Sequence, residues 1–188
     1  MALPLPKNAE LLCQTQNIKL WQWPQTLFDG SVAVFDCATR PDSVEIIPFI
    51  DEHTVLLTKQ EQPQKQEMFF AFPGGRVDAD EDLEIAAKRE LLEETGSTVS
   101  KILSWHRSPI NGVVRFEEEL FIGMLSKTKH PTHLDPGEKI ELMPTSWNDL
   151  VQMCLKNQLR SKSAMLAVLQ MEFDPASKER LHTWLRGT

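Results

Sequence analysis

The sequence predicts a mixed fold, α/β or α+β, built on a mixed β-sheet. Short apolar runs alternate with stretches of good helix formers, so strands and helices are interleaved along the chain. The chain has 188 residues, 41% hydrophobic and 25% charged, which suits one globular domain with a small appendage at most. No internal repeat or low-complexity tract points to another architecture.

The first forty residues favour strands over helices. Residues 31–35 form a β-branched and apolar run, and Asp29-Gly30 directly before it is a turn signal. We therefore expect a small N-terminal antiparallel β subdomain at residues 1–41, followed by the main domain at residues 42–188.

The next segment reads as a hairpin and a third strand. Apolar runs at 44–50 and 54–58 are separated by Asp51-Glu52-His53, which predicts two paired strands. A polar, Gln-rich connection then leads to an apolar strand at 68–72, which stops at Pro73.

A helix is predicted from about residue 82 to residue 95. Ala86-Ala87 and Leu91-Leu92 are good helix formers, and Gly96 is a natural stop. On a wheel of about 100° per residue, Ile85 and Leu92 point to one side, where a sheet could cover them.

Strands and then helices follow in the second half. We expect strands at 99–107 and 120–125, joined by a long loop at 109–119, and a short strand at 141–143 after a polar loop. Helices are expected at 145–157, 160–171 and 175–186, the first of them capped by Thr145 or Ser146.

Charge and cysteine content restrict the class of protein. The net charge of −7 argues against a broad nucleic-acid surface. The N-terminus lacks the pattern of a signal peptide, and no apolar run approaches the ~18 residues of a membrane span. Cys13, Cys37 and Cys154 are scattered without a CxxC pair, so we expect reduced thiols in or near the core of a cytoplasmic protein.

The segment FPGGRVDADEDLEIAAKRELLEETGS at residues 72–97 is crowded with carboxylates. On the predicted helix, Glu90, Glu93 and Glu94 project on one face, where they repel one another unless a cation joins them. Mg²⁺ prefers carboxylates together with water and phosphate oxygens. Gly74 and Gly75 let the backbone approach a ligand and offer a carbonyl or an amide.

This segment resembles the Nudix box. Gly75, Glu81, the run Arg89-Glu90-Leu91-x-Glu93-Glu94 and Gly96 all stand at the spacing of the motif; Ser97, where the family usually has an aliphatic residue, departs from it. The resemblance implies an α+β Nudix fold, a mixed sheet sandwiched between helices. It also implies hydrolysis of a nucleoside diphosphate linked to another group, with Mg²⁺, or alternatively Mn²⁺, as cofactor.

Site residues follow from the same resemblance. Glu94 and Glu90 would be the main metal ligands, with Glu93 beside them and the Gly74 carbonyl contributing. Glu90 and Glu93 would also take part in catalysis. Glu81 and Arg89 look like the internal ion pair of the box, which has a structural role.

More of the chain, from about residue 28 to residue 170, is similar to the ADP-ribose (ADP-sugar) pyrophosphatase branch. In that branch the N-terminal β subdomain supports a homodimer, and the partner chain helps to cradle the adenosine. Pro109 is a rough marker of the branch. Glu138 is the best match to the late acidic residue that acts as base or metal partner; Glu117, Glu118 and Glu119 are the other candidates.

Substrate contacts are suggested by charge and by ring chemistry. Arg40 and Arg115 are candidate diphosphate clamps, and Trp23 or Phe28 is a candidate adenine platform, although packing is the alternative role for these rings. Gln62 stands where the branch commonly has arginine, and Phe72-Pro73-Gly74-Gly75 differs from its common Pro-Ala-Gly-Gly.

These observations predict an enzyme for a small nucleotide substrate that binds neither nucleic acid nor membrane. The leading substrate is ADP-ribose or a related nucleoside diphosphate sugar. Two alternatives stay open, a Nudix hydrolase acting on coenzyme A, NADH or a dinucleotide, and a Nudix-fold module that binds a ligand without catalysis.

Overall fold

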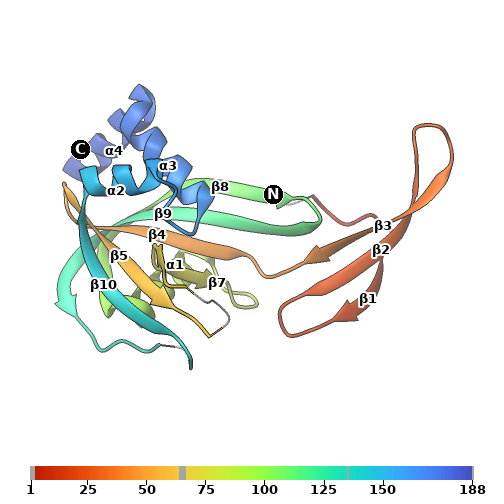
Figure 1. Cartoon of the computed structure of the whole chain (residues 1–188), viewed down its shortest axis with the longest axis horizontal. Coiled ribbons are helices and arrows are strands. Elements are labelled where there is room, and N and C mark those ends of the chain that lie inside the picture. The colour runs from red at the N-terminus through yellow and green to blue at the C-terminus, as the bar shows by residue number, and fades with distance from the viewer. Residues whose placement is uncertain (1–2, 64–66, 135, 188) are drawn as a thin grey trace.

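The computed structural model describes residues 3–63, 67–134 and 136–187. Within them the strands form one ten-stranded sheet whose main path is β1-β2-β3-β9-β4-β5-β10, with β6 on β5, β7 on β4 and β8 on β9. Figure 1 shows a body that carries all the helices and a thin arm that leads away from it. The body contains the predicted functional segment.

The arm is made of the first three strands, β1 (Glu10–Gln14), β2 (Lys19–Thr26) and β3 (Val32–Thr39), which pair antiparallel in sequence order. The arm joins the body where β3 runs parallel to the start of β9 (Val114–Lys129), with Ala38 opposite Val114 and Thr39 opposite Arg115. A division of the chain at residue 41 stays a prediction, since one continuous sheet crosses it.

The body sheet is mixed. Its centre is the parallel pair of β4 (Ser43–Asp51) and β9, and β5 (Thr54–Glu61) lies antiparallel to β4. The remaining strands are β6 (Phe69–Ala71), β7 (Gly74–Arg76), β8 (Ser97–Asn111) and β10 (Lys139–Ser146).

Helices cover both faces of this sheet. On one face α1 (Leu83–Thr95) packs through Ala86, Ala87 and Leu91 against alternate residues of β4 and β9. On the other face α2 (Trp147–Leu155), α3 (Lys162–Phe173) and α4 (Pro175–Arg186) enclose a larger core with Ile47 and Phe49. Figure 1 shows these three helices grouped on one side of the body. The predicted α+β fold, a mixed sheet between helices, is confirmed.

The long loop predicted at 109–119 is wrong. β8 and β9 pair almost to the hairpin tip, with Pro109 opposite Glu117 and Asn111 opposite Arg115. Asn111-Gly112 is a strong hairpin signal that the sequence interpretation overlooked. The hairpin brings Arg115 to the base of the arm.

The predicted sheet-facing side of α1 is also wrong. Ile85 is 60% exposed and Leu92 is half-buried, whereas Ala86, Ala87 and Leu91 are fully buried. The small alanine side chains let the helix lie close to the sheet, so the buried face is set by size as well as by hydropathy. With this face of α1 toward the sheet, Glu94 lies in the interior.

The three cysteines are free thiols, and Cys37 and Cys154 are buried as expected. Cys13 is exposed on β1, at the edge of the arm, so its predicted place in or near the core is wrong. Among the described residues, no helix combines the length and apolar character needed to cross a membrane.

Gly96 ends α1 and offers a test of this architecture. It has φ of 63°, and a Cβ atom there would lie 2.1 Å from the backbone oxygen of His130. We expect Gly96→Ala to lower the free energy of unfolding, measured by urea denaturation, by about 3 kcal/mol, because the left-handed strain of about 1–2 kcal/mol adds to this overlap.

Gly187 is the matched control. It also follows a helix with positive φ, 75°, but a Cβ atom there meets nothing within 4 Å. Gly187→Ala should therefore cost only about 1 kcal/mol. Equal losses in the two variants would contradict the close approach at Gly96.

Candidate active site

The loop before α1 and the helix itself are fixed by local hydrogen bonds. The Asp82 carboxylate accepts from the backbone N–H groups of Glu84 at 2.9 Å and Ile85 at 3.3 Å, which caps the helix. A Cβ atom at Gly75 would lie 2.4 Å from Oε1 of Glu90. A side chain at this position would displace the Glu90 carboxylate, which packs on the backbone of β7.

Arg89 joins the loop, the strand and the helix. Its Nε and Nη2 atoms donate to the two oxygens of Glu81, each at 2.9 Å, and Nη2 also donates to the backbone oxygen of Arg76 at 2.9 Å. Nη1 donates to Glu90 at 2.9 Å and to Glu93 at 3.0 Å. The hydrogen bonds with Glu81 raise the pKa of Arg89 and lower that of Glu81. The predicted pair of Glu81 and Arg89 is formed here.

Glu94 is the buried acid of the site, with only 5% of its surface exposed. Gln60 donates from Nε2 to its Oε1 at 3.5 Å, and the Gly74 N–H also hydrogen-bonds it. Oε2 is buried and has no hydrogen-bond partner among the described residues. Burial, followed by the charges of Glu90 and Glu138, raises the pKa of Glu94 to about 9. Such a carboxyl group is stabilised as an anion only if a cation reaches it.

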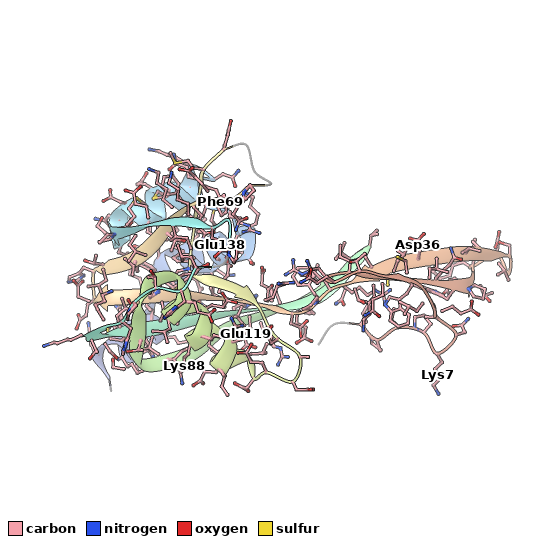
Figure 2. The ribbon with its side chains drawn as sticks, turned by 90° about the horizontal axis from the view of Figure 1, so that it is seen from below. Lys7, Asp36, Phe69, Lys88, Glu119 and Glu138 are labelled. Carbon is pink, nitrogen blue, oxygen red and sulfur yellow. The ribbon has the colours of Figure 1, made fainter. Side chains whose placement is uncertain are left out.

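Glu138 acts electrostatically on two of the helix glutamates. It lies just before β10, and its charge raises the pKa values of both Glu90 and Glu94. For Glu90 burial is the larger cause, and the hydrogen bonds from Arg89 oppose it. Figure 2 shows Glu138 in the body, far from the arm that carries Lys7 and Asp36.

This arrangement can bind a hard cation once its contacts change. Within the parts of the chain that the structure describes, no three His, Cys, Asp or Glu side chains are already gathered as a metal site. The reason is that Glu90 and Glu93 both form ion pairs with Arg89 in this structure. Glu94 Oε2 is the donor without a partner, and carboxylate oxygens are what Mg²⁺ prefers. The donor set therefore fits a divalent cation by its chemistry.

The three consecutive glutamates of β9 separate onto two faces. Glu117 and Glu119 are buried and both contact Arg107, whose Nε donates to Glu117 at 2.6 Å. Glu118 points the other way and accepts from the hydroxyl of Ser163. All three therefore have protein partners. The charge of Glu138 acts on the box glutamates Glu90 and Glu94.

The predicted substrate residues are spread along the junction and the arm. Arg40 lies 4.0 Å over the Phe116 ring, and Arg115 lies 5.5 Å over the Trp23 ring. Trp23 is 5% exposed, which favours packing. Of the other predicted substrate residues, Phe28 is fully exposed at the tip of the β2–β3 turn, and Pro109 lies in β8.

Gln60 is a site residue that the sequence interpretation missed. It is 4% exposed, and its amide donates to Thr58 at 3.0 Å as well as to Glu94. The Thr58 hydroxyl in turn donates to the backbone oxygen of Ala71 at 3.0 Å. Alternation along β5 could have revealed it, because Thr58 and Gln60 share one face of the strand.

Comparison with known proteins identifies the family that the chain matches. The NUDIX domain model matches residues 39–167. The chain is 22% identical over 177 residues to the methanol dehydrogenase activator of Bacillus methanolicus, covering 92% of this chain and 95% of that protein. It is 24% identical over 152 residues to the ADP-ribose pyrophosphatase of Bacillus subtilis (strain 168), covering 79% and 81%.

A solved structure has the same fold over nearly the whole length. It is described as an ADP compounds hydrolase and superposes with a TM-score of 0.74 at 17% identity, covering 96% of this chain and 93% of that chain.

The role of Arg89 can be tested through stability. We expect Arg89→Lys to lower the free energy of unfolding by about 2 kcal/mol in urea titrations, because lysine cannot make the two parallel hydrogen bonds to Glu81. The neighbouring Lys88 forms an exposed pair with Glu84 at 2.6 Å. Lys88→Gln is the control and should cost no more than about 0.5 kcal/mol. Losses of equal size would show that Arg89 does not hold the loop on the helix.

Proposed function

Since the chain belongs to the NUDIX domain family of hydrolases, we propose that it cleaves the diphosphate bond of ADP-ribose or a related nucleoside diphosphate sugar. The products would be a nucleoside monophosphate and a sugar phosphate. The cofactor would be Mg²⁺, or alternatively Mn²⁺. The observation that carries the proposal is the buried, unpartnered oxygen of Glu94 within a complete box scaffold. Free thiols suit a cytoplasmic enzyme.

The residues proposed to hold the metal are Glu94, Glu90 and Glu93, with the backbone of Gly74. When bound, the ion would offset negative charge on the phosphoryl oxygens and orient water. Gln60 and the Gly74 N–H keep the Glu94 carboxylate in place from the side. Arg89 would have to give up its hydrogen bonds to Glu90 and Glu93 but keep those to Glu81, so the loop would stay attached.

Glu138 is proposed as the base that takes a proton from the attacking water. A general base must lie within reach of the reacting atoms and have a suitable pKa. Support comes from its electrostatic influence on Glu90 and Glu94, which are two of the proposed metal ligands. Arg40 and Arg115 are proposed to bind the diphosphate, and Pro109 to shape the same region.

The arm is proposed to form a homodimer and to complete the adenosine site with Phe28 or Trp23. Large apolar side chains are exposed on all three of its strands. These are Leu11, Leu12, Leu20, Val32, Val34 and Phe35. A free chain rarely exposes so many apolar side chains on one small sheet, and a second copy would cover them.

Two observations support alternatives to the hydrolysis of ADP-ribose. Gln62 and Phe72 depart from the ADP-ribose pattern, which leaves coenzyme A, NADH and dinucleotides as alternative substrates. The relative from B. methanolicus is named as an activator of another enzyme, so a binding role without turnover is the second alternative.

Substrate and metal are tested together in one assay. The protein is incubated with Mg²⁺ and ADP-ribose, other nucleotide sugars, NADH, dinucleoside polyphosphates or coenzyme A, and products are separated by chromatography. We expect AMP from ADP-ribose, and at least a hundredfold slower release, roughly, in Glu94→Gln, because even supporting residues of metal sites contribute about 10–100-fold. Turnover should stop in EDTA.

Glu84→Gln is the control, since Glu84 is an exposed acid of the same helix and its ion pair is with the equally exposed Lys88. It should keep its activity. Hydrolysis of coenzyme A or NADH alone would move the assignment to the alternative substrates. Nucleotide binding without any turnover would disprove the enzymatic role.

The dimer is tested by one substitution on the arm. Val34 is 66% exposed on β3, and Val34→Lys should convert a dimer into a monomer in light scattering after gel filtration, because it buries a charge in an apolar interface. Ile85→Lys is the control, at a residue 60% exposed on α1. A wild-type monomer, or a Val34→Lys dimer, would argue against this interface.

A further inference from the structure

A second polar cluster lies beside the box, where β4 meets the start of α3. In the ladder between β4 and β7, Ser43 is opposite Arg76 and Glu45 is opposite Gly74. Ser43 and Glu45 are two residues apart on one strand, so their side chains lie on the same face. The cluster therefore shares its supporting strand, β7, with the box.

Two buried polar atoms in this cluster have no hydrogen-bond partner. They are Ser43 Oγ and Glu45 Oε2. Burial raises the pKa of Glu45 to about 7, with Ser161 as a hydrogen-bonding neighbour that opposes the shift. An unpaired buried polar group costs about 1–3 kcal/mol, and native proteins rarely keep one without a reason. Two such atoms lie on one face of β4, and the protein's described contacts leave both of them unsatisfied.

A cation and an aromatic ring lie next to these atoms. The guanidinium group of Arg160 is 5.1 Å from the centre of the Phe69 ring, and its charge acts on both Glu45 and Arg40. Within the described residues this guanidinium makes no hydrogen bond or ion pair of its own. Like charges on Arg160 and Arg40 repel, so an anion between or beside them would be stabilised.

Neighbouring hydroxyl groups are already engaged in contacts of their own. The hydroxyls of Ser161 and Ser163 lie 3.0 Å apart, and Ser163 donates to Glu118, the residue opposite Ser43 on β9. The two serine hydroxyls and Glu118 therefore hydrogen-bond among themselves. Within the described residues, Ser43 Oγ and Glu45 Oε2 keep no hydrogen-bond partner. The chemistry is thus a carboxylate and a hydroxyl beside an unpaired guanidinium.

We propose that Ser43, Glu45 and Arg160 form the subsite for the sugar phosphate half of the substrate. Glu45 and Ser43 would bind hydroxyls of the pentose, Arg160 would bind the phosphate attached to it, and the Phe69 ring would lie against the sugar. The inference rests on the proposed function and narrows it, because a pantetheine chain has no neighbouring pair of hydroxyls to meet these two atoms. It assigns the sugar to the side of Gly74 opposite the box helix.

The test measures binding of the two products separately. Ribose 5-phosphate and AMP are titrated by calorimetry into the full chain in EDTA, so that no metal contributes. We expect Glu45→Gln to weaken ribose 5-phosphate binding about tenfold and Ser43→Ala about threefold, from the usual strengths of charged and neutral hydrogen bonds. AMP binding should stay within about twofold. Glu141→Gln, on the exposed strand β10, is the control.

Stability gives an independent readout. Ser43→Ala removes an unpaired buried hydroxyl, so its melting temperature should not fall, whereas a structural serine would lower it. Unchanged ribose 5-phosphate binding in Glu45→Gln would overturn the inference, as would equal weakening for AMP and ribose 5-phosphate or no binding by the wild type. Binding that depends on Glu45 without hydrolysis of ADP-ribose would uphold this subsite and reject the proposed reaction.

Discussion

The hydrogen bonds of Arg89 are the interaction on which the active-site region depends. One guanidinium group contacts the loop through Glu81, the strand β7 through the Arg76 carbonyl, and its own helix through Glu90 and Glu93. Arginine can do this because its planar fork carries five donors in fixed directions. Without it, three carboxylates and a glycine-rich strand would have no common anchor, and their mutual repulsion would push the loop away from the helix.

On the same helix, Glu94 lies in an environment that is unfavourable for a carboxylate. It is buried, it has an oxygen without a partner, and it lies near Glu90 and Glu138. The fold tolerates this because the small residues of α1 bring the helix against the sheet and give a stable core on the same face. Stability sacrificed at one position and supplied by neighbouring packing is typical of functional sites.

Sequence reasoning reached the fold and the box because both depend on local signals. Helix formers, the stop at Gly96 and the spacing of charged residues are readable without any tertiary contact. The face of α1 that is buried was not readable, because Ala86 and Ala87 have smaller apolar side chains than Ile85 and yet are the residues that are buried. Gln60, Ser43 and Glu45 escaped notice for a related reason, since their significance depends on which strand lies opposite. Only pairing of β4 with β7, and of β5 with β6, brings them to the box.

The pairing of β4 with β7 also explains how β7 can lie between the box carboxylates and the proposed sugar subsite. β7 has three residues, and its glycines let Glu90 press on one side while β4 lies close on the other, where a Cβ atom at Gly74 would meet the Val44 oxygen at 2.2 Å. Carboxylates with an affinity for a cation therefore lie on one side of this strand, and Glu45 with Arg160 on the other. In a nucleoside diphosphate sugar the diphosphate is attached directly to the sugar, so the proposed metal ligands and the proposed sugar subsite would contact adjoining parts of one substrate. Two adjacent glycines, Gly74 and Gly75, make the separation between them as thin as a backbone allows.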